Sequence, residues 1–178
     1  MIRRLGVDEI GTTLIETTIA CAILVVVMAG LMGMAALATT ITENQGHLMA
    51  RTTEYAVDKM EQLLELTYGD AQSNTTVFPT VNTGGTGFAV GGSSDPAAPV
   101  NGYVDYLDQS GNVLCSVGTP CTTNPPGTWF YKRVWQVSVV STNLKQVTVT
   151  SIVRASVGRM KLPQSTVSAF KTNCPSGC

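Results

Sequence analysis

The feature that most constrains this chain is a stretch of 26 positions without a charged residue, between Glu16 and Glu43. Within this stretch, the 20 residues from Ile19 to Ala38 are almost purely apolar. A helix of that length spans about 30 Å, which is the thickness of the hydrocarbon core of a bilayer. The stretch therefore predicts a membrane-spanning helix.

A buried core helix and a cleaved secretory signal both fit this apolar run less well. A buried helix that is apolar on every side needs a larger protein around it than the roughly 110 residues that follow can build. A cleaved secretory signal has a shorter apolar core, whereas here the helical pattern continues beyond the run. Arg3 and Arg4 precede the run, and the next basic residue is Arg51. The positive-inside rule therefore predicts a cytoplasmic amino terminus and an exported remainder.

The helical pattern continues to about Tyr68, because residues 43–68 contain no proline and only one glycine. Apolar and small residues recur there at helical spacing and predict a face that packs on the rest of the protein. They are Leu48, Thr52, Tyr55, Met60, Leu63 and Leu66. The charged residues between them predict a solvated face, and these are Arg51, Glu54, Asp58, Lys59, Glu61 and Glu65. We therefore expect one helix, with a hydrophobic part over 12–38 and an amphipathic continuation over 39–68.

The remainder of the chain predicts loops followed by a sheet. Residues 69–127 are rich in Gly, Ser, Thr and Pro, with a hairpin expected around Gly111 and Asn112. Residues 128–178 alternate between apolar and polar, with a break at 141–143 and one more strand expected over 164–170. The expected fold class is α+β, in which the second half of the helix packs on one face of a carboxyl-terminal antiparallel sheet and forms a single core.

A short motif stands directly before the apolar run. It reads Gly11-Thr12-Thr13-Leu14-Ile15-Glu16 and follows a leader with two arginines. This motif resembles the signature of type IV prepilins and pseudopilins. The resemblance implies that residues 1–11 are a leader, that a prepilin peptidase cleaves between Gly11 and Thr12, and that Thr12 becomes the methylated amino terminus. Thr12 departs from the phenylalanine that is usual at this position, and the leader carries Asp8 and Glu9 close to the cut.

Glu16 has a physical reason to be functional. A carboxylate at the edge of a bilayer-length apolar helix is costly unless it is paired. The α-amine that cleavage would create at Thr12 offers a partner, and the amino-terminal end of a helix favours an acidic group. The resemblance implies in addition that Glu16 pairs with the amine of a neighbouring subunit and sets the axial register of a filament.

The resemblance also implies a function. It predicts a structural subunit, of the minor class, of a type IV pilus or a type II secretion pseudopilus, with a type IV pilin-like fold. The implied partners are other pilin or pseudopilin subunits, the prepilin peptidase and the inner-membrane assembly platform. The implied location is a single pass through the inner membrane, with the carboxyl-terminal domain in the periplasm and later in a filament. The alternative is an uncleaved, membrane-anchored periplasmic domain for binding or adhesion.

Four of the five cysteines fall in the exported part, where an oxidising compartment permits disulfides. Pairing of Cys115 with Cys121 and of Cys174 with Cys178 is one possibility, and crossed pairing of Cys115 with Cys174 and of Cys121 with Cys178 is the other. Cys21 lies in the apolar run and is expected to be a small packing residue.

Catalytic, metal and nucleic-acid chemistry is not indicated by the sequence. With His47 as the sole histidine, neither a metal site with the cysteines nor a Ser/His/Asp set is expected, so we predict no enzyme and no cofactor. The Gly84–Gly92 stretch lacks the Lys-Ser/Thr of a phosphate-binding loop. Asp105, Asp108 and Asn112 do not have the spacing of an EF-hand, and we expect a solvated turn. A net charge of −1 and a pI near 5.7 give no basic excess for nucleic acid.

The charges are divided unevenly along the chain. Residues 12–110 contain ten acidic and two basic residues, whereas residues 111–178 contain seven basic and no acidic ones. Two interpretations are open. The basic sheet compensates the acidic helix within one subunit, or it contacts the acidic helix of another subunit in a head-to-tail filament.

Overall fold

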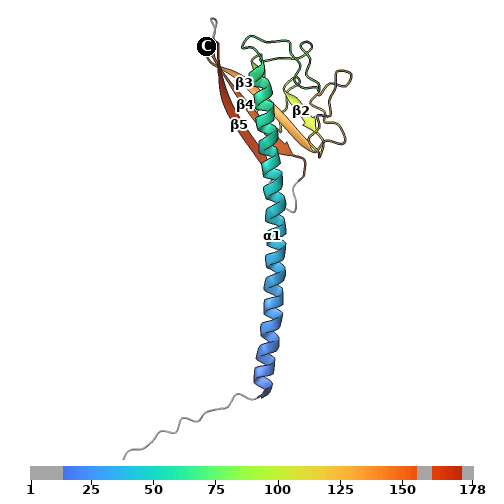
Figure 1. Ribbon diagram of the computed structural model, residues 1–178, viewed down its shortest axis with the longest axis vertical. Helices are drawn as coiled ribbons and strands as arrows, with labels where there is room; N and C mark the ends of the chain where they lie inside the picture. The colour runs from blue at the N-terminus through green and yellow to red at the C-terminus, as the bar shows by residue number, and fades with distance from the viewer. Residues whose placement is uncertain (1–13, 156–161, 174–178) are drawn as a thin grey trace, which may run out of the picture. The chain divides into compact units, whose positions relative to one another are not determined.

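The computed structural model describes residues 14–155 and 162–173. The chain divides into two compact units, Met1–Thr42 and Glu43–Cys178. A single helix, α1 (Leu14–Glu65), has 52 residues and contributes to both units (Figure 1). The expected helix over 12–68 is thus confirmed over nearly its whole length, although it ends at Glu65. Leader residues 1–11 and Thr12 lie outside the described residues.

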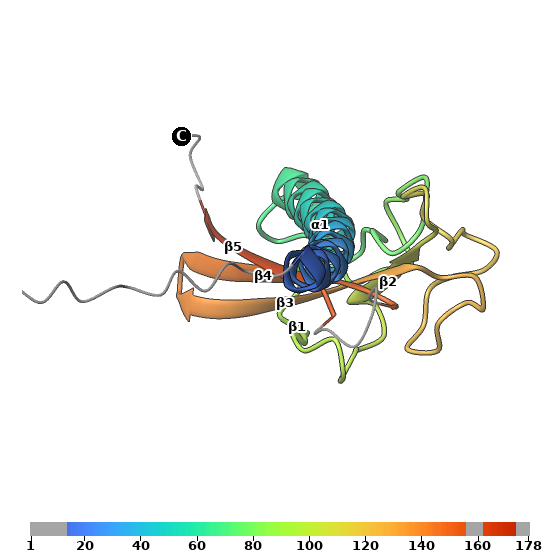
Figure 2. The same ribbon diagram turned by 90° about the horizontal axis from the view of Figure 1, so that it is seen from below.

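The second unit holds an antiparallel sheet in which β1, β3, β4 and β5 lie side by side and β2 also pairs with β3. Figure 2 shows the second half of the helix, from Glu43 onward, over one face of this sheet. The strands are β1 (Gly91–Gly92), β2 (Val104–Leu107), β3 (Tyr131–Ser141), β4 (Leu144–Val153) and β5 (Gln164–Thr172). An α+β layout with the second half of the helix on an antiparallel sheet is therefore confirmed.

The main core lies between the second half of α1 and the sheet. Helix residues with i, i+4 and i+7 spacing, Ala56, Met60 and Leu63, are buried there. The sheet contributes alternate residues of its central strands, because successive side chains in a strand point to opposite faces. The sheet residues of this cluster are Trp135, Val137, Val147 and Val149.

The expectation of a single core is wrong, because a second apolar cluster forms away from the helix. All four residues of β2 are buried. Asp105 contacts the helix, so its neighbours Val104 and Tyr106 point to the opposite face, where loops cover them. The other buried members of this second cluster are Val77, Cys115, Cys121 and Val134. The loop region 69–127 thus has a structural task of its own, which is to cover the far face of β2 and β3.

The loop region forms less strand than the sequence predicts after Gly111, and more than it predicts at Gly91 and Gly92. The turn around Gly111 is confirmed, since the Asp108 amide donates to the Asn112 carbonyl at 2.9 Å, but the second arm of the expected hairpin forms only one isolated bridge, between Leu107 and Val113. By contrast, Gly91 and Gly92, expected in a loop, pair with β3. A Cβ at Gly92 would lie 2.2 Å from the Trp135 carbonyl oxygen, so this close pairing requires a glycine.

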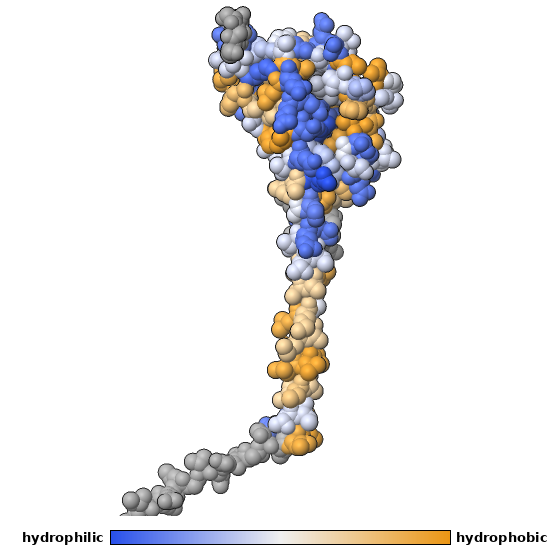
Figure 3. All heavy atoms as spheres, in the orientation of Figure 1, coloured by the Kyte–Doolittle hydropathy of each residue, from blue (hydrophilic) through white to orange (hydrophobic). Residues whose placement is uncertain are grey.

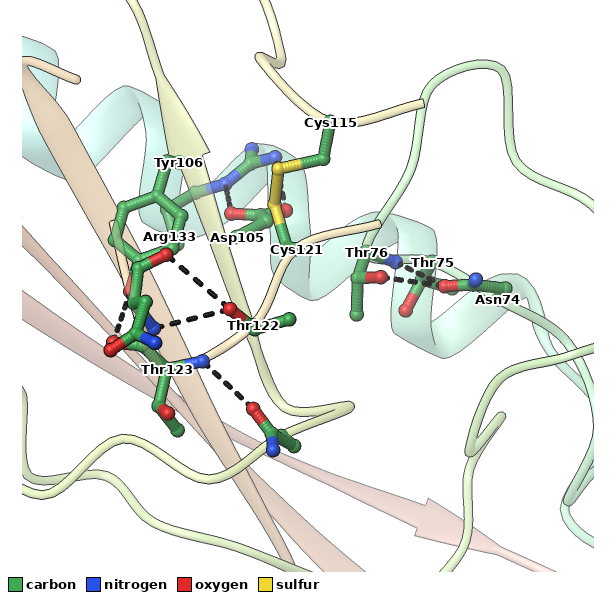
Figure 4. The surroundings of a disulfide bond; sticks show 12 residues. Asn74, Thr75, Thr76, Asp105, Tyr106, Cys115, Cys121, Thr122, Thr123 and Arg133 are labelled. Atoms are coloured by element: carbon green, nitrogen blue, oxygen red, sulfur yellow. Dashed lines mark hydrogen bonds and ion pairs between the residues drawn. A yellow bond between two sulfur atoms is a disulfide. The ribbon is translucent and has the colours of Figure 1, made fainter. Parts of the chain in front are cut away.

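One expected disulfide is present. Cys115 and Cys121 are bonded, with 5.3 Å between their Cα atoms, and both are buried in the second cluster (Figure 4). This excludes the crossed pairing of Cys115 with Cys174 and of Cys121 with Cys178. Cys174 and Cys178 lie outside the described residues, and their pairing stays a prediction. Cys21 is a free, exposed cysteine.

Removal of this disulfide is expected to destabilise the second unit. A cross-link that closes so short a loop restricts the unfolded chain by about 2 kcal/mol. We therefore expect the double variant Cys115→Ser/Cys121→Ser to lose about that much free energy of unfolding, measured by urea denaturation of the full chain in detergent micelles. Cys21→Ser is the matched control and should leave the urea midpoint unchanged. An unchanged midpoint in the double variant would contradict the expectation.

Candidate functional site

The amino-terminal half of α1 is an exposed apolar surface. Every residue from 14 to 40 is exposed, and the most hydrophobic window of this helix is entirely unburied. Figure 3 shows this apolar stretch of the helix in orange. By length and composition it is a candidate membrane span. An apolar helix that its own chain does not cover needs lipid or other helices around it.

Threonines at both ends of this segment satisfy their own hydroxyl groups. Thr17 donates to the Leu14 carbonyl at 2.9 Å, and Thr39 donates to the Ala36 carbonyl at 2.9 Å. Thr18, Thr40 and Thr42 make equivalent bonds to carbonyls three or four residues earlier. A hydroxyl bonded in this way is less costly to place in a membrane, because its polar hydrogen is already paired.

Glu16 lies in the first turn of α1 and is exposed. It is the only charged residue between Leu14 and Thr42, and it makes no ion pair within the described part of the chain. The predicted partner, the amine of Thr12, and the predicted cleavage site after Gly11 lie outside the described residues. The roles of all three residues therefore stay predictions.

A shallow apolar groove of about 450 Å³ runs along the same segment. Its lining residues have i, i+3, i+4, i+7 and i+8 spacing, which places them on one face of the helix. They are Ala20, Ile23, Leu24, Val27 and Met28. Such a stripe, with a small residue at one end, has the shape that a second helix packs against.

The second unit contains a buried charge network that the sequence did not reveal. Lys59, expected on the solvated face of the helix, is fully buried, and its Nζ lies 2.7 Å from Asp105 Oδ2. The same carboxylate accepts from Arg133, at 2.8 Å from Nε to Oδ1 and 2.8 Å from Nη2 to Oδ2. Figure 4 shows the guanidinium of Arg133 beside Asp105. One buried acid thus binds two buried bases.

Further contacts satisfy the remaining donors of the two bases. Arg133 Nη1 donates to Asp58 Oδ2 at 2.7 Å, which balances the second positive charge. Lys59 donates to the Thr75 carbonyl at 2.6 Å and lies 4.6 Å from the centre of the Trp135 ring. Because α1, β2, β3 and the loop after the helix each contribute a group, the network joins four parts of the second unit.

Burial and neighbouring charges set the protonation of this network. Burial lowers the pKa of Lys59 to about 8, and the nearby Arg133 adds to that effect, with Asp105 only partly opposing it. Burial alone would raise the pKa of Asp105, but the charges of Arg133 and Lys59 outweigh it, so that the pKa lies below the ordinary 3.8. Arg133 keeps a raised pKa despite its burial, because Asp105 and Asp58 face it.

Two further lysines bind the carboxyl-terminal end of α1, which has no basic residue in its own last turn. Lys145 on β4 and Lys171 on β5 are register neighbours. Lys171 donates to the carbonyls of Leu64 and Leu66, and Lys145 donates to the carbonyl of Tyr68 at 2.8 Å. Burial lowers the pKa of both lysines. Lys171 thus satisfies the Leu64 carbonyl, which the helix end leaves unpaired, whereas the Leu66 and Tyr68 carbonyls lie just beyond the helix. Both cations complement the negative end of the helix dipole.

The basic residues after Gly111 are bound within the second unit, most of them by backbone carbonyls. Each basic residue that the structure describes after Gly111 donates to a carbonyl or a carboxylate of the same chain. These residues are Lys132, Arg133, Lys145, Arg154 and Lys171. Arg133 alone among them pairs with acidic side chains, Asp58 on the helix and Asp105 on β2, so both interpretations of the uneven charge stay predictions.

Asp105, Asp108 and Asn112 do not come together around a cation. Asp105 belongs to the buried network, whereas Asp108 is half-buried and accepts from the amides of Ser110 and Asn112. Across residues 14–155 and 162–173, no group of three His, Cys, Asp or Glu side chains is placed to hold a metal ion.

The sequence did carry one signal for the buried charge network. Arg133 lies midway between Tyr131 and Trp135, and alternate residues of a strand point to the same face. Arg133 therefore lies on the apolar face of the sheet.

Removal of the acid at the centre of the network should be strongly destabilising. Asp105→Asn leaves two buried bases without their carboxylate, and breaking a buried pair in this way costs about 3–5 kcal/mol. Urea denaturation of the full chain in detergent, followed by tryptophan fluorescence, measures the loss. Asp108→Asn is the matched control, because residue 108 lies outside the buried network and an amide oxygen there can still accept from the turn amides. Equal midpoints for the two variants would show that the network contributes nothing.

The pKa of Lys59 predicts a dependence of stability on alkaline pH. Between about 8 and 10.5 the unfolded chain binds a proton at Lys59 that the folded chain does not, so the free energy of unfolding rises with pH in that window. Lys59→Met leaves the Asp105–Arg133 pair intact and removes this dependence. We therefore expect the stability of the wild type, relative to Lys59→Met, to increase from pH 8 to pH 10 in urea titrations. A constant difference would contradict the lowered pKa.

Comparisons with known proteins do not add an identification: no protein-family model matches the chain, and neither a curated protein nor a solved structure matches it.

Proposed function

We propose that this chain is a prepilin-type subunit that is held in a membrane by α1, cleaved between Gly11 and Thr12, and then assembled into a filament through the same helix. The observation that carries the proposal is the exposed apolar half of α1 with Glu16 as its only charge. The leader-to-helix motif supports it, because a glycine, a glutamate five positions later and an uninterrupted apolar stretch coincide. The role is assembly rather than catalysis.

The energetics of the exposed half make a cover of lipid or of other helices a physical requirement. Apolar side chains left in water cost roughly 25 cal/mol for each Å² of accessible surface. Large side chains along the segment, such as Leu24, Val26 and Met34, are more than half exposed. Lipid covers them before assembly, and neighbouring α1 helices cover them afterwards. The apolar groove between Ala20 and Met28 offers one surface for such a neighbour.

Glu16 supplies the selectivity that apolar packing lacks. Apolar helices slide past one another at little cost, whereas a carboxylate in an apolar environment is stable only beside a cation. The cleaved amino terminus of an adjacent subunit provides that cation at a defined height. A pilus and a secretion pseudopilus share this chemistry, and the proposal covers both. The alternative, an uncleaved anchored domain for binding or adhesion, is an outcome of the first test below.

Amino-terminal processing separates the two possibilities. The full chain, produced in bacterial membranes together with a prepilin peptidase, should begin at Thr12 and carry an amino-terminal methyl group in intact-mass and peptide measurements. Gly11→Val should block cleavage, because the peptidase requires a small residue before the cut. The matched control is Gly6→Val, which changes a leader glycine away from the cut. A wild-type chain that retains Met1 in the presence of an active peptidase would support the uncleaved anchor.

Substitution of Glu16 should abolish assembly without affecting processing. Glu16→Ala removes the carboxylate that pairs with a neighbouring amine, and cleavage after Gly11 does not depend on that pair. We expect the variant to be processed but absent from sheared filaments, as measured by immunoblotting of membrane and filament fractions. Glu43→Ala, at the other end of the uncharged stretch, is the control and should assemble normally. Wild-type levels of the Glu16 variant in filaments would overturn the assembly role.

A further inference from the structure

We propose that the buried charge network fixes the register of α1 on the sheet of the second unit, so that its main effect is on where the helix docks rather than on how stable the docked state is. The network is Lys59 and Asp58 on α1, Asp105 on β2 and Arg133 on β3. This inference concerns the second unit alone and does not depend on the proposed function.

The apolar part of the interface selects one register only weakly. On the helix it consists of Ala56, Met60 and Leu63. A shift of one turn along the axis would place Met60 at the position of Ala56, Leu64 at that of Met60 and Thr67 at that of Leu63, which keeps apolar side chains at two of the three positions. The sheet side, with Val147 and Val149 at its centre, offers β-branched side chains of similar size. Cores tolerate such exchanges when the apolar pattern is kept.

The charges do not tolerate the same shift. A one-turn shift places Leu63 or Tyr55 where Lys59 now meets Asp105. It also takes the Lys59 ammonium away from Asp105, to the half-buried position of Tyr55 or the buried position of Leu63, and a buried charge that loses its partner is unfavourable. Asp105 and Arg133 stay together in any register, because β2 and β3 pair them directly. Only the register in the structure therefore pairs all four charges.

The pairing is reciprocal, and this makes it specific. The helix gives one base to an acid of the sheet, at 2.7 Å between Lys59 Nζ and Asp105 Oδ2, and one acid to a base of the sheet, at 2.7 Å between Asp58 Oδ2 and Arg133 Nη1. Two consecutive helix residues of opposite charge, Asp58 and Lys59, thus pair with two residues of opposite charge that lie opposite each other on β2 and β3, Asp105 and Arg133. A buried polar group that determines register at some cost in stability is a known device in coiled coils.

The test replaces the three buried members by apolar residues of similar size, in the variant Lys59→Met/Asp105→Leu/Arg133→Met. Asp58 stays, because it is about half exposed and water solvates it. Two cysteine pairs report the register of the full chain in detergent, with Cys21, Cys174 and Cys178 replaced by Ser. Thr53→Cys/Ser165→Cys reports the observed register, since the two hydroxyl oxygens lie 2.7 Å apart. Val57→Cys/Ser165→Cys reports a shift of one turn.

With the native network, oxidation should cross-link the first cysteine pair and not the second. In the triple variant we expect the thermal unfolding midpoint to be unchanged within a few degrees or raised, and both cysteine pairs to cross-link. The yield of the first pair should fall to about half as two registers share the population. Cross-linking confined to the first pair in the folded triple variant would overturn the proposal, and so would a large drop of the midpoint with the register retained.

The single variant Lys59→Met keeps the proposal testable if the triple variant does not fold. It leaves the Asp105–Arg133 pair neutral and removes one of the two reciprocal contacts. We expect it to fold and to give a measurable yield of the second cysteine pair, above that of the native network. Arg51→Met, which removes an exposed ion pair with Glu54 on the same helix, is the control and should give none. No increase in Lys59→Met would overturn the proposal.

Discussion

The second unit depends on the burial of one carboxylate between two bases. Asp105 accepts from Arg133 through both oxygens and from Lys59 through one, and none of the three side chains reaches solvent to a meaningful extent. Removing such charges from water is costly, and the cost is met only when each group finds its partners. The position of the helix, the pairing of β2 with β3 and the path of the loop that supplies the Thr75 carbonyl are therefore mutually dependent.

The first unit is governed by the opposite condition, which is the absence of charge. Glu16 is the only charged residue between Leu14 and Thr42. The threonines near both ends of this segment donate their hydroxyl hydrogens to backbone carbonyls. One continuous helix thus meets two environments. Its first half excludes polar groups so that lipid or other helices can surround it, and its second half brings charges inward to bind a sheet. The change occurs near Glu43, where the two units divide.

The sequence predicted the elements governed by periodicity and missed the contacts governed by pairing. The apolar run and the spacing of Met60 and Leu63 sufficed for the helix, and the alternation after Tyr131 sufficed for β3 and β4, because each of these patterns follows from local geometry. Lys59 was misassigned, since a lysine at that position looks solvated until its distant partner is known. The second cluster was missed for a similar reason. Val104 and Val134 need a cover on the far face, and only the path of the loops supplies it.

The sequence was more informative for the candidate site than for the core. The motif at Gly11, Thr12 and Glu16 is read directly from neighbouring residues, and no tertiary contact was needed to recognise it. For the same reason the structure adds little to that motif, since Gly11 and Thr12 lie outside the described residues. Of the four cysteines in the second unit, only Cys115 and Cys121 are described, and the bond between them was one of the two pairings that the sequence left open.

The lysines that bind the end of α1 affect the stage of synthesis at which the helix end can be stabilised. The helix precedes the strands along the chain, yet the cation that binds the Leu64 carbonyl in its last turn, Lys171, comes from β5. Lys145 of β4 binds the Tyr68 carbonyl just beyond the helix. A nascent chain that has not yet delivered Lys171 therefore has a helix whose final turn is unfinished. The end of the helix gains this partner only when β5 has been added, so a chain truncated before β5 has an unpaired carbonyl at the end of α1.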